Sequence, residues 1–104
     1  MISVVINFPV PEDITPEAYK DKMKDTVPRY QNIPGLMRKN YIFNEKSRVG
    51  GGIYSFDNLE DAKACFDEAW QKRVEANFGK PEITYFDTLI ELDNILNTVK
   101  VNDE

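Results

Sequence analysis

The chain has 104 residues, with 13 lysines and arginines against 18 aspartates and glutamates, which gives a net charge of -5. The length predicts one domain, and the acidic balance disfavours nucleic acid as a partner. No apolar run approaches the ~20 residues that span a bilayer, and the start of the chain lacks a signal-peptide pattern. We therefore expect no membrane association and a location in the cytoplasm.

Two residue types narrow the possible chemistry. Histidine is absent, which excludes the usual Ser-His-Asp and Cys-His nucleophile systems and histidine-ligated haem, zinc or iron. Cys65 is the single cysteine, so neither an internal disulfide nor an iron–sulfur cluster fits one chain. The sequence thus leaves carboxylates, lysine, tyrosine, asparagine, arginine or the substrate itself for any reaction.

The first half of the chain predicts a strand, a helix and a second strand. Apolar residues alternate from about Ile2 to Phe8, as in a strand with one buried face. A helix begins at Thr15-Pro16, with Thr as N-cap and Pro at the first helical position. Its apolar stripe recurs at helical spacing and consists of Tyr19, Met23, Val27 and Tyr30. Pro28 should kink or shorten this helix, and a strand follows over about 36–44.

The second half repeats that order. A polar connection leads to a strand over about 51–56 whose opening glycines indicate a bulge or a close approach of the backbone. One helix is expected over about Leu59–Phe78, and Gly79 ends it. The next strand is expected over about Glu82–Ile90, followed by a short helical turn or a strand extension. The domain then covers 1–98, and 99–104 is expected to be a frayed tail.

The order β-α-β then β-α-β predicts a ferredoxin-like α+β fold with an antiparallel sheet and helices on one face only. The third and fourth predicted strands nevertheless carry large apolar residues on both faces. A sheet face that is open to solvent should be polar. An uncovered apolar face would expose a larger apolar patch than a monomer normally does. The sequence therefore predicts a homodimer joined sheet to sheet, a dimeric α+β barrel.

Several short motifs resemble one family. Pro34-Gly35-Leu36, then Lys39 and Tyr41, then the block 51–56 and Phe86-Asp87 resemble the YdhR-like mono-oxygenases of the dimeric α+β barrel superfamily, near the antibiotic-biosynthesis mono-oxygenases. The resemblance covers about 34–97. It implies a dimer and the oxidation of an aromatic or polyketide-like compound by dioxygen without metal or flavin. Haem-degrading relatives need a helix-borne histidine, which this chain lacks.

Three residues are the catalytic candidates. Lys39 lies mid-strand, where a cation could hold a phenolate, although it could equally be a solvated lysine or half of a salt bridge. Tyr41 could donate a hydrogen bond to substrate or simply pack in the sheet. Asn7 is a lone amide in an apolar strand and resembles the first-strand asparagine of related mono-oxygenases. Its alternative role is to mark the strand end.

Five residues are the candidates for substrate binding, namely Tyr54, Phe66, Trp70, Arg73 and Tyr85. The aromatic members would form the apolar wall of a pocket between sheet and helices, and their alternative is plain core. Arg73 borders the helix stripe and would face a substrate anion, or its charge would reach water.

The leading hypothesis is a cofactor-independent mono-oxygenase acting on a small hydroxylated aromatic compound. Two alternatives remain open at this stage. One is a non-catalytic, stress-related dimer that binds a small apolar ligand. The other is an isomerase or decarboxylase of the same superfamily.

Overall fold

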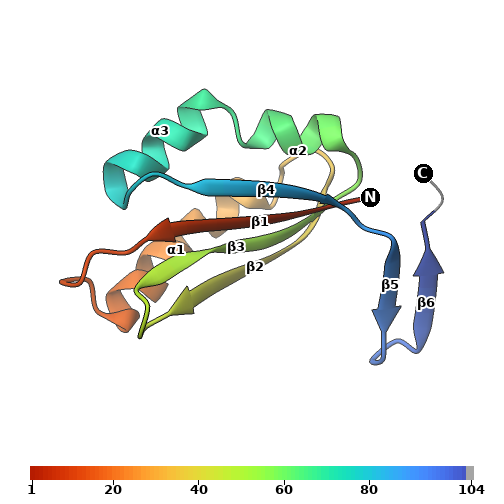
Figure 1. Ribbon diagram of the computed structural model, residues 1–104, viewed down its shortest axis with the longest axis horizontal. Helices are drawn as coiled ribbons and strands as arrows, with labels where there is room; N and C mark the ends of the chain where they lie inside the picture. The colour runs from red at the N-terminus through yellow and green to blue at the C-terminus, as the bar shows by residue number, and fades with distance from the viewer. Residues whose placement is uncertain (103–104) are drawn as a thin grey trace.

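The computed structural model describes residues 1–102 and shows a four-stranded antiparallel sheet with helices on one face (Figure 1). The strand order is β2-β3-β1-β4, and a separate two-stranded hairpin, β5-β6, follows β4. This is the predicted ferredoxin-like α+β fold. In chain order the elements are β1 (Ile2–Pro9), α1 (Pro16–Tyr30), β2 (Leu36–Asn44), β3 (Val49–Phe56), α2 (Leu59–Cys65), α3 (Glu68–Asn77), β4 (Glu82–Asp87), β5 (Ile90–Asp93) and β6 (Thr98–Val101).

The core lies between the sheet and the helices. Alternate residues of β1 are buried, as the apolar alternation predicted, and Val4 and Ile6 are fully enclosed. The register sets Val4 opposite Tyr54 of β3 on one side and Tyr85 of β4 on the other, and Tyr54 opposite Lys39 of β2. One row of side chains therefore crosses all four strands on the helix-covered face, because residues paired across an antiparallel ladder share a face.

Helix α1 begins as the sequence predicted. The Thr15 side chain accepts a hydrogen bond from the backbone of Ala18, and Pro16 occupies the first position. Pro28 does not end the helix, which continues to Tyr30. Because Pro28 lies in the last turn, only one intrahelical bond is lost there, and Gln31 still donates to the carbonyl of Val27.

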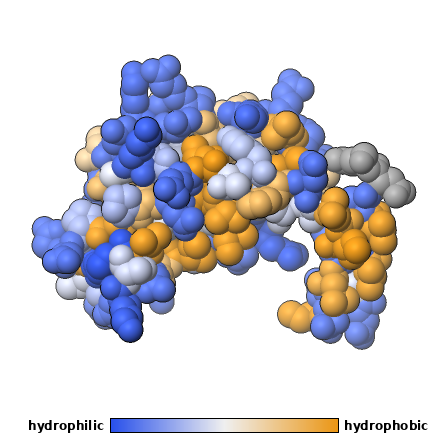
Figure 2. Space-filling view, in the orientation of Figure 1, coloured by the Kyte–Doolittle hydropathy of each residue, from blue (hydrophilic) through white to orange (hydrophobic). Residues whose placement is uncertain are grey.

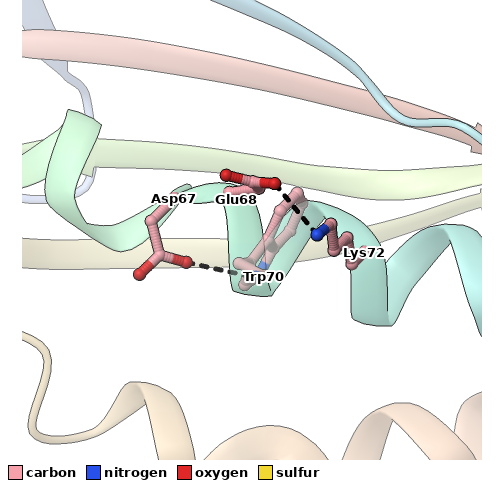
Figure 3. Close-up of polar contacts among 4 residues, drawn as sticks. All are labelled: Asp67, Glu68, Trp70 and Lys72. Carbon is pink, nitrogen blue, oxygen red and sulfur yellow. Dashed lines mark hydrogen bonds and ion pairs between the residues drawn. The ribbon is translucent and has the colours of Figure 1, made fainter.

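The prediction of a single helix over Leu59–Phe78 was wrong, because the segment breaks after α2. Asp67 caps α3 by accepting a hydrogen bond from the backbone N–H of Trp70 at 2.9 Å, and Glu68 pairs with Lys72 on the same helix (Figure 3). An aspartate that caps a new helix competes with continuing the old one. The break leaves Phe66 buried at the junction, where its ring packs against those of Tyr54 and Trp70.

The end of the chain also differs from the prediction. Strand β4 stops at Asp87 rather than Ile90. Of the two alternatives for the following segment, the structure shows strand, β5, and not a helical turn, and in the tight turn after it Asp93 accepts hydrogen bonds from two backbone N–H groups. Residues 99–101, predicted to be part of a frayed tail, belong to β6, and the backbone of Asn102 donates to Leu89. The β-branched residues Thr98, Val99 and Val101 favour this strand. Residues 103 and 104, the rest of the predicted tail, lie outside the described residues.

The glycines of β3 serve the close backbone approach that the sequence suggested. Gly51 has a φ of 152°, and a Cβ there would overlap the carbonyl oxygen of Ile6 on β1. The neighbouring Gly50 leaves the space that the Tyr19 hydroxyl occupies. The pairing of β1 with β3 is continuous through these glycines, and the irregular register lies instead in β2, between Leu36 and Arg38.

The face of the sheet away from the helices, together with the hairpin, exposes apolar side chains. Ile53 and Phe86 are 42% and 51% exposed on this open face. The hairpin projects from the domain (Figure 1), and its residue Ile95 is 92% exposed. Figure 2 shows hydrophobic surface over the middle of the body and again on the projecting hairpin. Within residues 1–102, no helix has the length and apolarity to cross a membrane.

Candidate functional site

A cavity of about 230 Å³ lies between the sheet and helices α1 and α3. Six aromatic side chains form most of its wall: Phe8, Tyr30, Tyr41, Tyr54, Trp70 and Phe78. The charged residues that line it are all basic and comprise Lys22, Arg29, Lys39 and Arg73. The site is therefore an aromatic pocket with cationic groups, in a chain whose overall charge is negative.

Lys39 is the distinctive residue of this cavity. Its Nζ atom lies 3.3 Å from the ring centroid of Tyr30, 3.8 Å from that of Tyr41 and 4.9 Å from that of Tyr54. Within the part of the chain that the structure describes, its amine makes no hydrogen bond and no ion pair. A lysine enclosed by rings and left without an acidic partner is rare, because burial penalises the ammonium form.

Burial lowers the pKa of Lys39 from 10.5 to about 7. The nearby Cys65 opposes this shift in the pKa, and the charge of Arg29 adds a smaller effect in the same direction as burial. The three ring faces also attract the ammonium form, so they limit how far burial can drive the amine to neutrality. The result is an amine that can gain or lose a proton near neutral pH.

The tyrosines around Lys39 are held in place by hydrogen bonds. Thr26 donates its hydroxyl proton to the Met23 carbonyl, so the Tyr41 hydroxyl donates to the Thr26 oxygen at 2.7 Å. The indole N–H of Trp70 donates to the Tyr30 hydroxyl at 2.8 Å. Helix α1, helix α3 and strand β2 are thereby tied together around the amine.

Burial raises the pKa of Tyr54 and of Tyr41 above the usual value for a phenol. Burial likewise raises the pKa of the nearby Cys65 thiol to about 11. These groups stay protonated at neutral pH, and they can donate hydrogen bonds but cannot accept a proton. Lys39 is thus the group of this cluster whose pKa suits a general base.

The structure brings together five of the eight residues that the sequence singled out: Lys39, Tyr41, Tyr54, Trp70 and Arg73 all line the cavity. Phe66 does not line the cavity but packs against two residues of its wall, with its ring centroid 4.8 Å from that of Tyr54 and 4.9 Å from that of Trp70.

The structure does not bring Asn7 and Tyr85 to this cavity. Asn7 alternates with the buried residues of β1 and so lies on the open face, where it is half-buried rather than enclosed. The sequence showed the alternation but not that this face lacks helices. Tyr85 is on the helix-covered face of β4, but its ring lies below Lys63, with Nζ 4.6 Å from the centroid. It is separated from Lys39 by the width of the sheet.

Four polar residues of the wall were missed from sequence, namely Lys22, Thr26, Arg29 and Asn77. The first three recur at spacings of four and three along α1, next to the apolar stripe, and Asn77 follows Arg73 by four on α3. That periodicity could have placed them beside the pocket, because residues at this spacing share a helix face. Across residues 1–102, no group of three or more His, Cys, Asp or Glu side chains is arranged to hold a metal ion.

The family model described as "Putative mono-oxygenase ydhR" matches residues 4–98. The chain belongs to this ydhR family. No curated protein matches the chain. The family assignment confirms the resemblance seen in the sequence motifs, and it supports mono-oxygenase activity at the level of the family.

Solved structures share the ydhR-family fold at low sequence identity. A "putative antibiotic biosynthesis monooxygenase" from Nitrosomonas europaea is 17% identical, with a TM-score of 0.65 over 85% of this chain and 89% of that one. A protein from Shewanella oneidensis is 16% identical, with a TM-score of 0.62 over 82% and 87%. Another "putative antibiotic biosynthesis monooxygenase", from Bordetella bronchiseptica, is 12% identical, with a TM-score of 0.61 over 85% and 96%.

Proposed function

We propose that this protein is a mono-oxygenase that oxidises a small hydroxylated aromatic compound with dioxygen, without a metal or flavin. The observation that carries the proposal is the Lys39 amine, which faces an aromatic cavity without an acidic partner and has a pKa of about 7. The volume, about 230 Å³, is below the roughly 300–1,000 Å³ of pockets for drug-sized ligands, so a compact substrate is expected.

The first chemical step is a proton transfer. The neutral amine of Lys39 accepts the proton of the substrate hydroxyl, and the resulting ammonium pairs with the phenolate. The low polarity of the aromatic wall strengthens this pair. The hydroxyl group of Tyr54 remains protonated and can donate to the substrate oxygen, whereas the Tyr41 hydroxyl already donates to Thr26 and contributes its ring to the wall.

The second step is the reaction of the phenolate with dioxygen. Phenol and dioxygen give a quinone and water: the O–H bond and one ring C–H bond break, and a new C–O bond forms. Four electrons pass from the ring to dioxygen. One oxygen atom stays in the product, and the other leaves as water with the two hydrogens. The electron-rich anion is itself the reductant, so the balance needs no further co-reactant.

The proposed assembly is a homodimer in which a second copy covers the open face. Its support is the exposed apolar surface of Ile53, Phe86 and the β5-β6 hairpin, on which Leu92 and Leu96 are 66% and 68% exposed. Single exposed apolar residues are common on monomers, but a group of them on one face is typical of a surface that another chain covers. A second copy is the partner that the sheet itself favours, since a two-fold interface uses the same patch twice.

The decisive experiment is oxygen uptake by the purified protein with a panel of quinols, naphthols and anthrone-like compounds, in the presence of a metal chelator. Uptake should be matched by quinone formation and should incorporate one atom of isotope-labelled dioxygen. Lys39→Met should abolish it, whereas Lys46→Met, which removes the same charge in the β2-β3 turn, should not. Turnover of the same compounds in the absence of oxygen would contradict the proposal.

A further inference from the structure

Four cations converge on the cavity without an acidic partner. Lys22 and Arg29 come from α1, Arg73 from α3 and Lys39 from β2, and no aspartate or glutamate lines the cavity with them. Within residues 1–102, none of the four forms an ion pair, and the ion pair on α3 joins Lys72 to Glu68 instead. The chain holds 18 acidic residues against 13 basic ones, so this one-sided lining does not reflect composition.

The two arginines differ from Lys39 in depth. Arg29 and Arg73 are exposed, while Lys39 is half-buried beneath the rings of Tyr30 and Tyr41. Helices α1 and α3 lie on the same face of the sheet (Figure 1). Because both arginines line the cavity and are exposed, they stand at its mouth. The site thus has an inner cation and two outer ones, with aromatic walls between them.

Like charges gathered around one cavity repel one another. Arg29 acts on Lys39 in this way, since its charge disfavours the lysine ammonium. A negatively charged ligand removes this repulsion, and a low-dielectric wall makes the effect larger than on an open surface. Arginine binds planar carboxylates in particular, because its guanidinium donates two parallel hydrogen bonds to them.

We propose that the substrate is a hydroxylated aromatic acid, whose carboxylate is bound by Arg29 and Arg73 at the mouth while its ring hydroxyl reaches Lys39. This inference rests on the proposed function for the role of Lys39, and it adds the second anionic group and the residues that select it. The aromatic ring of the substrate then lies along the wall that Tyr41, Tyr54 and Trp70 provide.

Trp70 allows a direct test, because it is the single tryptophan of the chain and its indole lies in the cavity wall. Quenching of its fluorescence is measured with a hydroxynaphthoate, with the corresponding carboxamide and with the corresponding aryl phosphate, all without oxygen. We expect the acid to bind about tenfold more tightly than the carboxamide, because a charge-assisted hydrogen-bond pair contributes a difference in affinity of about this size. Equal binding of acid and carboxamide, or tighter binding of the aryl phosphate, would overturn the proposal.

The variants Arg73→Gln and Arg29→Gln should each reduce the preference for the acid several-fold and leave carboxamide binding unchanged. Lys72→Gln is the matched control, because it removes the same charge from the exposed residue next to Arg73. Thermal unfolding of each variant shows whether it is folded. If Lys72→Gln lowers the preference as much as Arg73→Gln does, the effect comes from net charge and the proposed contact is wrong.

The two proposals fail separately. Selective binding of the acid without oxygen uptake would refute the mono-oxygenase proposal and retain the anion site. Oxidation of the acid and the carboxamide with equal kcat/KM would refute the anion site and retain the mono-oxygenase proposal.

Discussion

The same strands form both faces of the sheet, but helices cover only one of them. On the helix-covered face, residues such as Val4 and Phe56 are fully buried, and hydrogen bonds join Tyr41 to α1 and Trp70 to Tyr30. On the open face, Ile53 and Phe86 are about half exposed, and the hairpin residue Ile95 is almost wholly exposed.

This difference separates the formation of the cavity from the covering of the open face. The cavity and its lysine are formed within one chain, because α1, α3, β2 and β3 of that chain supply Lys39 and the aromatic rings around it. The open face has no such completion, and the proposed homodimer would cover it with a second copy of the chain. The predictions below test each face separately.

The largest effect is expected at Lys39. Lys39→Met should lower kcat by about 10²–10⁴, the range that a general base contributes. Lys39→Arg should not restore it, because a guanidinium keeps its proton and cannot act as a base, although it preserves the charge. Steady-state oxygen uptake measures both. Substantial activity of Lys39→Arg would show that a positive charge, and not a base, is what the reaction requires.

The next effect is on assembly. Phe86→Asp should weaken self-association about 100-fold, because an aspartate in an apolar interface loses its hydration. Sedimentation over a concentration series measures the change, and Phe86→Leu, which keeps an apolar side chain, is the control. If wild type and Phe86→Asp are both monomers at every concentration, the open face is not a dimer interface.

A third effect concerns how the free energy of unfolding depends on pH through Lys39 on the helix-covered face. Because the pKa of Lys39 falls from 10.5 to about 7 on folding, the unfolded chain binds one more proton between these values. Stability due to this group therefore rises with pH across that window, and below about pH 7 it carries a constant penalty. Lys39→Met should accordingly be more stable than wild type by about 1–3 kcal/mol at low pH, with the difference vanishing towards pH 10.5.

Urea unfolding of wild type, Lys39→Met and Lys46→Met at several pH values measures this difference. Lys46→Met shows how much of the difference comes from removing one positive charge. A difference that does not vary with pH would mean that the folded protein leaves the Lys39 amine solvated.

The smallest effect is expected at the hydrogen bond between Trp70 and Tyr30. Tyr30→Phe keeps the ring over Lys39 and removes the acceptor of the indole N–H, which should cost about 1–2 kcal/mol. Tyr85→Phe is the matched control, because Tyr85 is half-buried and its hydroxyl makes no hydrogen bond within residues 1–102. Equal loss of unfolding free energy in both variants would mean that this bond adds nothing specific.

Much of the covered face was predictable because local rules determine it. The alternation in Ile2–Phe8 determines which side of β1 is buried, and Thr15-Pro16 determines where α1 begins. The absence of histidine and the position of Lys39 in a strand were enough to single out this lysine. Periodicity also placed Trp70 and Arg73 on one side of a helix.

Tertiary structure alone decided the rest. The break at Asp67 combines a local helix cap with the burial of Phe66 against Tyr54 and Trp70, and no local pattern shows that burial. The hairpin forms because residues separated in the sequence pair across a turn, such as Ile90 with Val101 at its open end, and pairing depends on distance in space. Asn7 was assigned to the pocket because one strand does not reveal which face the helices cover. The pKa of Lys39 likewise depends on three rings and two helices that meet around it, and these contacts exist only in the folded chain.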